Sequence, residues 1–184
     1  VLNFRTESDN KMASFAEEGS SFKRYQEDIP AELLNVLDEE HHHGLRRLIT
    51  YLLQCMRDIG DHLRSGHFSH DVAGTQNAFG DHQLDVDMKA DDLIFDYLRR
   101  SRVVEVASSE ENPVEVDCGG EGYSVAFDPL DGSSIVDANF AVGTIVGVWP
   151  GRGFLNRKGK EQIAGIVVMY GPRVTLAIGL SGSI

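Results

Sequence analysis

Two stretches of the chain carry apolar residues at the spacing of an amphipathic helix. In the first, from Leu45 to Leu63, apolar side chains recur at steps of three and four residues, and a similar pattern runs from Leu84 to Arg100. Such steps place the apolar side chains on one face of a helix. The pattern therefore predicts two helices, each packing one face on a core. The apolar face of the second would consist of Leu93, Ile94, Tyr97 and Leu98.

After residue 100 the pattern changes to short runs rich in Val, Ile and aromatic residues, which are typical of strands. Gly171-Pro172-Arg173 separates the last two runs and predicts a hairpin there. Helices followed mainly by strands, without regular alternation, predict a layered α+β fold with N-terminal helices packed on a largely antiparallel sheet. The expected strands are 103–107, 123–127, 141–149, 163–170 and 174–180.

Three polar segments complete the organisation. Residues 1–30 lack periodicity and are expected to form a flexible N-terminal segment before a single domain at 31–184. Residues 66–80 hold three glycines and are expected to form a loop. His41-His42-His43 is interpreted as a solvated helix start, because neighbouring histidines on a helix point in different directions and chelate poorly.

Composition excludes several classes of protein. The 184 residues carry a formal net charge of −12, which disfavours nucleic acid or an anionic membrane as the partner. No apolar run approaches the roughly 20 residues of a membrane span. Cys55 lies in the first helical pattern and is expected in the core, whereas Cys118, before two glycines, is expected to be an exposed loop thiol. Two cysteines form no disulfide framework, so a reducing compartment, with cytoplasm as the default, is expected.

Phe127–Ser134, Phe-Asp-Pro-Leu-Asp-Gly-Ser-Ser, carries the clearest chemistry in the chain. Asp128 and Asp131 flank a proline at which the preceding strand is expected to end. Carboxylates are hard oxygen ligands suited to Mg²⁺, with Mn²⁺ as a substitute. Gly132 permits close backbone approach, and the N–H groups of a helix start can hold a phosphate. Either half alone is more typical of a turn, but together they predict metal-assisted phosphate ester hydrolysis.

This octapeptide resembles the signature of the fructose-1,6-bisphosphatase and sedoheptulose-1,7-bisphosphatase family. The run after it, ending in Gly147-Val148-Trp149-Pro150-Gly151, is more similar to the sedoheptulose branch. The resemblance implies a homo-oligomeric, Mg²⁺-dependent enzyme that hydrolyses the 1-phosphate of a sugar bisphosphate. An inositol-phosphate or nucleotide phosphatase is an alternative, against which this long run counts. A second alternative is a truncated, non-catalytic relative that binds metal or sugar phosphate or pairs with a full-length subunit.

Carried over position by position, the resemblance implies a set of metal ligands drawn from three segments. Ser109-Glu110-Glu111 matches a family motif in which Glu110 would share metals with Asp128. Gly80-Asp81 matches a segment whose aspartate approaches a metal and the attacking water. The implied metal ligands are Asp81, Glu110, Asp128, the backbone carbonyl of Leu130, and Asp131.

The resemblance also implies catalytic and phosphate-binding groups. Asp81, Asp87 and Glu111 would position or deprotonate the attacking water, with Asp85 as the rival of Asp87 for this role. Asp91 and Asp92 are interpreted as surface charges of the helix start. The substrate phosphate would be held by Asp131, Gly132, Ser133 and Ser134.

The resemblance covers about residues 40–180 and lacks the family's C-terminal sugar-binding part. We therefore expect the metal-binding part of a bisphosphatase, inactive alone. Two departures concern regulation. Residues 66–80 contain no cysteine, where plastid sedoheptulose bisphosphatases carry a regulatory pair, and Gly122-Tyr123 stands where AMP-regulated enzymes carry Lys-Tyr. A plastid or other organelle is the alternative compartment if an upstream targeting segment exists.

Overall fold

This computed structural model describes residues 2–3, 44–65, 72–76 and 82–181. The histidine run at 41–43 and Asp81 lie outside the described residues. So does the predicted flexible segment, apart from Leu2–Asn3, which form a short strand. Among the described helices, none is long and apolar enough to cross a lipid bilayer.

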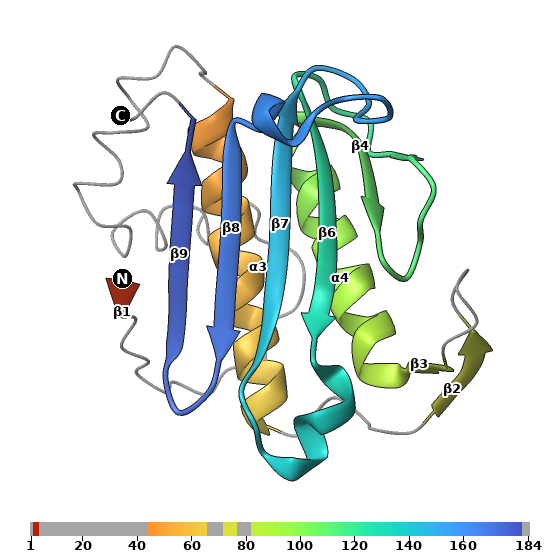
Figure 1. Cartoon of the computed structure of the whole chain (residues 1–184), viewed down its shortest axis with the longest axis vertical. Coiled ribbons are helices and arrows are strands. Elements are labelled where there is room, and N and C mark those ends of the chain that lie inside the picture. Colours follow the sequence, from red (N-terminus) through yellow and green to blue (C-terminus); the bar gives the residue numbers. More distant parts are fainter. Residues whose placement is uncertain (1, 4–43, 66–71, 77–81, 182–184) are drawn as a thin grey trace, which may run out of the picture.

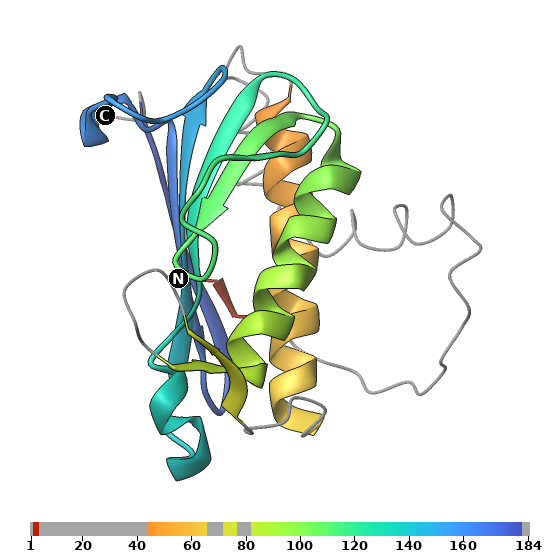
Figure 2. The same cartoon turned by 90° about the vertical axis from the view of Figure 1, so that its right-hand side faces the viewer.

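Two long helices lie side by side on one face of a sheet (Figures 1 and 2). They are α3, Leu45–Ser65, and α4, Asp85–Ser101, which confirms both predicted helices. Each buries the apolar face that its sequence pattern predicts, and Leu48, Ile49, Leu52, Ile94 and Leu98 are fully inaccessible to solvent. Burial of such side chains contributes about 1.5–3 kcal/mol each, so the helices are fixed by the sheet beneath them.

The main sheet has seven strands in the order β1-β9-β8-β7-β6-β4-β5. Every neighbouring pair is antiparallel except β4 and β6, which run parallel. Helices on one face of a largely antiparallel sheet confirm the predicted α+β fold. The strands are β1 Leu2–Asn3, β4 Val104–Ser109, β5 Val116–Asp117, β6 Tyr123–Asp131, β7 Val142–Pro150, β8 Ala164–Tyr170 and β9 Val174–Leu180.

A second, two-stranded sheet corrects the expectation of a plain loop at 66–80. β2, Val72–Gln76, pairs antiparallel with β3, His82–Leu84, just before α4 begins. The predicted hairpin at 171–173 is confirmed, because Tyr170 pairs with Val174 across that turn. Short 3₁₀ helices, η1 Ser133–Ala138 and η2 Gly159–Glu161, lie in the connections that follow β6 and β7.

The expectation that the strand before the octapeptide ends at its proline is wrong. β6 continues through Pro129 to Asp131, and its pairing with β7 shifts by one residue between Asp128 and Asp131. This shift is a β-bulge, which inserts one extra residue into one strand. Proline is tolerated there because a bulge interrupts the ladder of N–H donors that proline cannot join.

Cys118 is not the exposed thiol that its glycine neighbours suggest. Its side chain is only 4% exposed, because its N–H donates to the Glu105 carbonyl (2.8 Å) and folds the segment onto the edge of β4. Gly120 follows, with its N–H on the Val104 carbonyl (2.9 Å); a Cβ there would come within 2.7 Å of that oxygen. Close backbone packing, rather than a free loop, therefore explains the glycines. Cys55 is buried as predicted.

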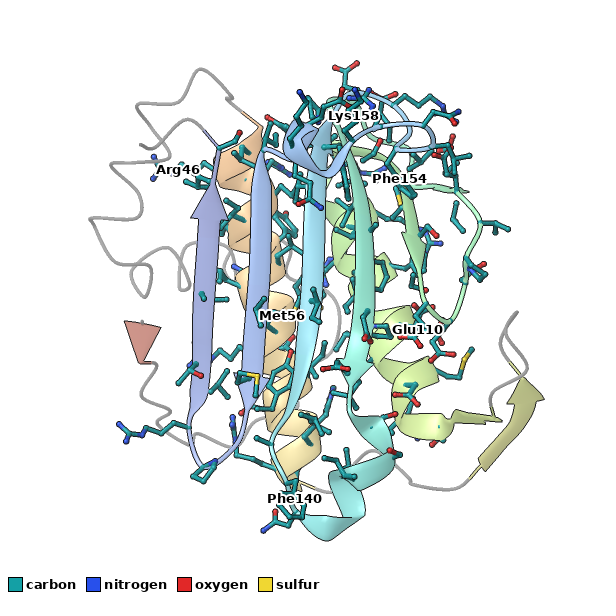
Figure 3. All side chains as sticks on the ribbon, viewed as in Figure 1. Arg46, Met56, Glu110, Phe140, Phe154 and Lys158 are labelled. Carbon is teal, nitrogen blue, oxygen red and sulfur yellow. The ribbon has the colours of Figure 1, made fainter. Side chains whose placement is uncertain are left out.

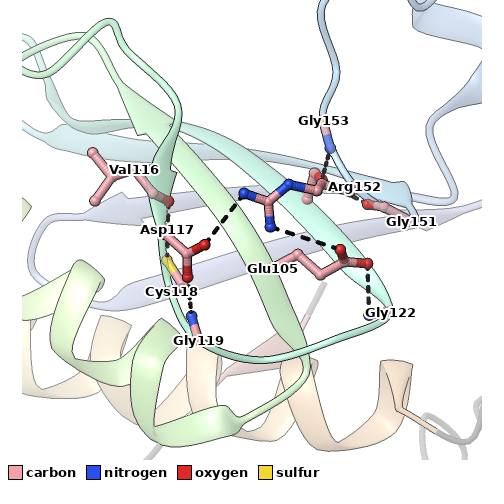
Figure 4. A network of polar contacts seen from close by, with 10 residues as sticks. Glu105, Val116, Asp117, Cys118, Gly119, Gly122, Gly151, Arg152 and Gly153 are labelled. Carbon is pink, nitrogen blue, oxygen red and sulfur yellow. Dashed lines mark hydrogen bonds and ion pairs between the residues drawn. The ribbon is translucent and has the colours of Figure 1, made fainter.

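A surface network closes the end of the sheet where β6 begins and β7 ends (Figure 4). Arg152 forms an ion pair with Asp117 (3.2 Å) and lies 4.0 Å from the Glu105 carboxylate. The Asp117 carboxylate accepts the Gly119 N–H (2.8 Å), and this bond with the Arg152 contact lowers its pKa. The octapeptide lies at the opposite end of β6, so this network supports the sheet without reaching the candidate site.

Candidate metal and phosphate site

The topology brings the predicted site segments to one end of the sheet. Because β4 and β6 are parallel neighbours, their carboxyl ends meet at the same edge. Glu110 follows β4 directly and lies beside α4 and β6 (Figure 3). α4 leads back into β4, so its first turn, which holds Asp87, lies at this edge too.

A closed turn carries Glu110 and Glu111. The Ser109 N–H donates to the Asn112 carbonyl (3.1 Å), and the Asn112 N–H donates back to the Ser109 hydroxyl (2.9 Å). The Ser108 hydroxyl adds a bond to the same Asn112 carbonyl (3.2 Å). The two glutamates are the central residues of this four-residue turn, so a hydrogen-bonded frame fixes their backbone.

Glu110 and Asp128 lie side by side. The Glu110 N–H donates to the Phe127 carbonyl (3.2 Å), which extends the parallel ladder one step beyond β4. Partial burial raises the pKa of the Asp128 carboxyl to about 7, and the neighbouring Glu110 charge adds to this rise. Burial and the repulsion between these neighbouring carboxylates together leave the Asp128 carboxyl holding a proton near neutral pH unless a cation replaces it.

The backbone on either side of Asp128 is anchored. The Phe127 ring packs edge-on against Phe95 of α4, with ring centroids 5.2 Å apart. The Leu130 N–H donates to the Asp128 carboxylate (3.1 Å), a local bond that lowers the pKa of that group and opposes the effects of burial and repulsion. Asp131 is exposed, and its charge further raises the Asp128 pKa. The two aspartates of the octapeptide are therefore close enough to interact electrostatically.

A helix start follows Asp131, as the sequence predicts. Gly132 adopts φ 83°, a left-handed conformation that favours glycine, and its carbonyl accepts the Ile135 N–H (3.0 Å). Ser133 and Ser134 form the first turn of η1, and the Ser134 side chain is exposed. The use of their backbone N–H groups to hold a phosphate stays a prediction.

The residues present fit a hard divalent cation. Glu110 and Asp128 supply adjacent carboxylates, Leu130 supplies a backbone carbonyl, and every one of these donors is oxygen. A cation would relieve both the burial of the Asp128 charge and its repulsion by Glu110, the two effects that raise the Asp128 pKa. Within the described residues no group of three His, Cys, Asp or Glu side chains could hold a metal ion. Of the other predicted carboxylate ligands, Asp131 is described and exposed, whereas Asp81 lies outside the described residues.

Comparison with known sequences identifies the family. The sequence profile described as fructose-1-6-bisphosphatase, N-terminal domain, matches residues 32–183. The chain belongs to the fructose-1,6-bisphosphatase family. The family assignment inferred from the octapeptide is thereby confirmed.

Related bisphosphatases come from both branches. A chloroplastic sedoheptulose-1,7-bisphosphatase of Chlamydomonas reinhardtii is 50% identical over 74% of this chain and 34% of the algal protein. A class 1 fructose-1,6-bisphosphatase of Geobacter sulfurreducens is 38% identical over 88% of this chain and 50% of the bacterial protein. The chain thus spans a third to a half of the length of these relatives.

Solved bisphosphatase structures share the fold. The holo form of Leishmania major fructose-1,6-bisphosphatase superposes with a TM-score of 0.70 at 25% identity, covering 79% of this chain and 50% of the other. A Toxoplasma gondii protein described as a sedoheptulose-1,7 bisphosphatase superposes with a TM-score of 0.68 at 32% identity, covering 79% of this chain and 49% of the other. The α+β arrangement is therefore that of the bisphosphatase family.

Asp85 and Asp87, the two candidates for contact with the attacking water, have different surroundings at the start of α4. Asp87 is 5% exposed, whereas Asp85 is partly exposed and forms an ion pair with Lys89 (2.5 Å). A carboxylate already engaged by a lysine one turn away is a poorer base than one held beside the site. The arrangement favours Asp87 for contact with the attacking water, and that role stays a prediction.

Asp91 is buried against β4 and is not the surface charge expected from the sequence. Asp91 is 4% exposed and forms a hydrogen bond with Ser109, and the charge of Glu111 contributes to raising its pKa. Its Oδ1 atom finds no hydrogen-bond partner among the described residues. The sequence held a signal, because Asp87, Asp91, Ile94 and Leu98 are spaced four, three and four apart on one helix face.

Replacing Asp91 with asparagine is expected to stabilise the protein without added metal by about 1–2 kcal/mol at pH 8, with little change at pH 4. Burial raises the pKa of Asp91 to about 6, so the folded protein binds a proton more tightly than the unfolded chain does. Stability is therefore lost as pH rises from the ordinary value of 3.8 to about 6, and the loss is complete at pH 8. Asparagine carries no charge and avoids this loss.

Urea unfolding at the two pH values measures the difference. Asp92→Asn is the matched control, since that neighbouring carboxylate is exposed and acts on Asp91 only through its charge, so its removal should change stability at pH 8 much less than Asp91→Asn does. Equal effects of Asp91→Asn at pH 4 and pH 8 would contradict the assignment of a buried, titrating Asp91.

Proposed function

We propose that the protein carrying this chain is a Mg²⁺-dependent phosphatase that removes the 1-phosphate of a sugar bisphosphate, with sedoheptulose 1,7-bisphosphate as the preferred substrate. The observation that carries the proposal is the pairing of Glu110 and Asp128 just before a helix start in the same octapeptide. Similarity to sedoheptulose bisphosphatases, at 50% identity for the algal protein, supports the substrate.

The chain's own residues divide the work. Glu110, Asp128, Asp131, Asp81 and the carbonyl of Leu130 would hold Mg²⁺, or Mn²⁺ in its place. When bound, such an ion neutralises phosphate oxygens, lowers the pKa of water and stabilises the leaving oxygen. The N–H groups that follow Asp131, those of Gly132, Ser133 and Ser134, would hold the phosphate in line for attack.

Two further carboxylates would handle the attacking water. Asp87 lies buried in the first turn of α4, and Glu111 lies on the turn that also presents Glu110. Each can accept a hydrogen bond from water and take its proton, with Asp81 as the third candidate. In this proposal, different groups bind the cation and orient the nucleophile.

Phosphate release by the full-length gene product tests the proposal, with sedoheptulose 1,7-bisphosphate and fructose 1,6-bisphosphate assayed side by side in Mg²⁺ and in EDTA. Mg²⁺-dependent release with a preference for the seven-carbon sugar supports it. Preference for fructose 1,6-bisphosphate would overturn the substrate but keep the reaction. No release from either sugar at saturating Mg²⁺ would favour the alternative of a non-catalytic relative that binds metal or sugar phosphate.

Compartment and assembly belong to the same proposal. Cytoplasm is the default, but the chloroplastic algal and spinach relatives favour the plastid alternative. Imaging of the full-length gene product fused to a fluorescent protein distinguishes the two. A homo-oligomer is expected, and sedimentation of the full-length protein measures its state.

A further inference from the structure

The bulge in β6 disturbs the ladder in the middle of the octapeptide. Asp128 pairs with Ile145 and Asp131 with Gly143, so three steps along β6 match two along β7. The extra residue of a bulge leaves backbone groups without their usual ladder partners. The peptide between Pro129 and Leu130 lies inside this interval, where both residues are buried. A buried carbonyl without a partner destabilises the fold, so this peptide needs another donor.

Thr144 supplies that donor from the opposite strand. Its side chain is fully buried, and its hydroxyl donates to the Pro129 carbonyl (2.8 Å). The Tyr170 hydroxyl of β8 lies 2.9 Å from the Thr144 hydroxyl oxygen and 3.2 Å from the Met56 sulfur of α3. Because Thr144 has given its one proton to Pro129, Tyr170 is the donor in the bond between the two hydroxyls, and it shares that proton with the Met56 sulfur, a weak acceptor.

The other end of the same peptide plane reaches Asp128. The Pro129 carbonyl and the Leu130 N–H belong to one planar unit and point in opposite directions. The carbonyl accepts from Thr144 on the core side, while the N–H donates to the Asp128 carboxylate (3.1 Å). Rotation of this peptide would break both bonds together. The Thr144 hydroxyl therefore sets the direction of the N–H that orients Asp128.

We propose that Thr144, held by Tyr170, is a positioning residue that locks the Pro129–Leu130 peptide and through it orients the Asp128 carboxylate toward the cation. The link to cation binding rests on the proposed function, whereas the lock itself is a property of the fold. Neither hydroxyl touches the cation or the substrate. Partners that orient metal ligands in this way commonly change affinity 10- to 100-fold when removed.

The test measures Mn²⁺ affinity by electron paramagnetic resonance in the full-length gene product, with Mn²⁺ as the probe. Thr144→Val removes the hydroxyl at nearly constant volume and is expected to weaken Mn²⁺ binding at least about tenfold. Thr144→Ser keeps the hydroxyl and should restore affinity to within about twofold of wild type. Tyr170→Phe leaves Thr144 its donor but removes the group that orients it, so an intermediate loss is expected.

Thr50→Val is the matched control. Thr50 is also buried, but its hydroxyl donates to the Arg46 carbonyl (2.8 Å) within α3, away from the octapeptide. This variant loses the same chemical group and should keep wild-type Mn²⁺ affinity. Equal affinity of Thr144→Val and Thr50→Val would overturn the proposal. If Thr144→Val does not fold, wild-type affinity in Tyr170→Phe would overturn it instead.

Amide hydrogen exchange separates this proposal from the proposed function. In metal-free protein, the Leu130 N–H should exchange at least about tenfold faster in Thr144→Val than in Thr50→Val, because the lock that holds its bond to Asp128 is gone. Unchanged exchange at Leu130 would overturn the lock whether or not the protein binds metal. Failure of wild type to bind Mn²⁺ or release phosphate, with faster exchange in Thr144→Val, would overturn the cation-binding part alone.

Discussion

Replacing Asp128 with asparagine is expected to lower Mg²⁺-dependent phosphate release by at least about a thousandfold, about 4 kcal/mol of barrier. Asp128 is the carboxylate beside Glu110, and an amide supplies neither its charge nor its affinity for a hard cation. Asp131→Asn should cause a similar loss, since the Asp131 charge lies close enough to Asp128 to raise its pKa. Initial rates at saturating Mg²⁺ with the full-length gene product measure both effects.

Asp96→Asn is the control for this experiment. Asp96 is exposed on α4 and lies 3.4 Å from Arg100, so its loss removes one carboxylate without disturbing the site. Wild-type rates are expected in this variant, and circular dichroism should show all three variants folded. Near-normal turnover in Asp128→Asn or Asp131→Asn would remove that residue from the set of metal ligands.

The metal-free protein is expected to lose stability as the pH is raised, in a manner that Asp128→Asn suppresses. Partial burial and the Glu110 charge raise the Asp128 pKa from 3.8 to about 7, so the folded state holds a proton that the unfolded chain releases. Unfolding therefore becomes more favourable between these pH values. After allowance for solvent screening of a half-buried group, the difference between the two proteins should be about 1–2 kcal/mol at pH 8.

Urea unfolding in EDTA from pH 4 to pH 8 measures this trend in both proteins. Saturating Mg²⁺ should flatten the wild-type curve, because a cation binds the folded state and replaces the proton. Asp91, whose pKa is raised to about 6 by burial, should leave a residual slope in Asp128→Asn. Parallel curves for the two metal-free proteins would show that Asp128 does not carry the repulsion assigned to it.

The sequence predicts the elements well because local periodicity determines them. The steps from Leu45 to Leu63 predict α3, and the runs rich in Val and Ile predict strands β6 to β9 and the hairpin of the last two, because each pattern follows from local packing. The octapeptide also indicates its own chemistry, since ligand types and a helix start follow each other in eight residues. These are properties of neighbours in the chain.

The sequence-based predictions that are wrong concern residues whose structure is determined by tertiary contacts. The sequence predicts that the strand ends at Pro129 because proline lacks an N–H, yet a bulge against the neighbouring strand β7 lets β6 continue, and Thr144 of β7 satisfies the Pro129 carbonyl. The sequence predicts that Asp91 is a surface charge because aspartate is rarely buried, but in the structure Ser109 of β4 packs against it. The sequence predicts that Cys118 is an exposed loop thiol, but packing against the edge of β4 buries it. In each case the deciding partner is remote in sequence.

The parallel pairing of β4 with β6 has a consequence for the order of folding. The hairpin of β8 and β9 closes through three residues, whereas β4 must meet β6 across the whole segment that includes β5. Loop closure across a longer segment loses more entropy, and non-local pairing slows folding. Glu110 follows β4 and Asp128 lies in β6, so this late pairing brings the two carboxylates together. The ability to bind a cation should therefore appear only in the last steps of folding, after the meander has formed.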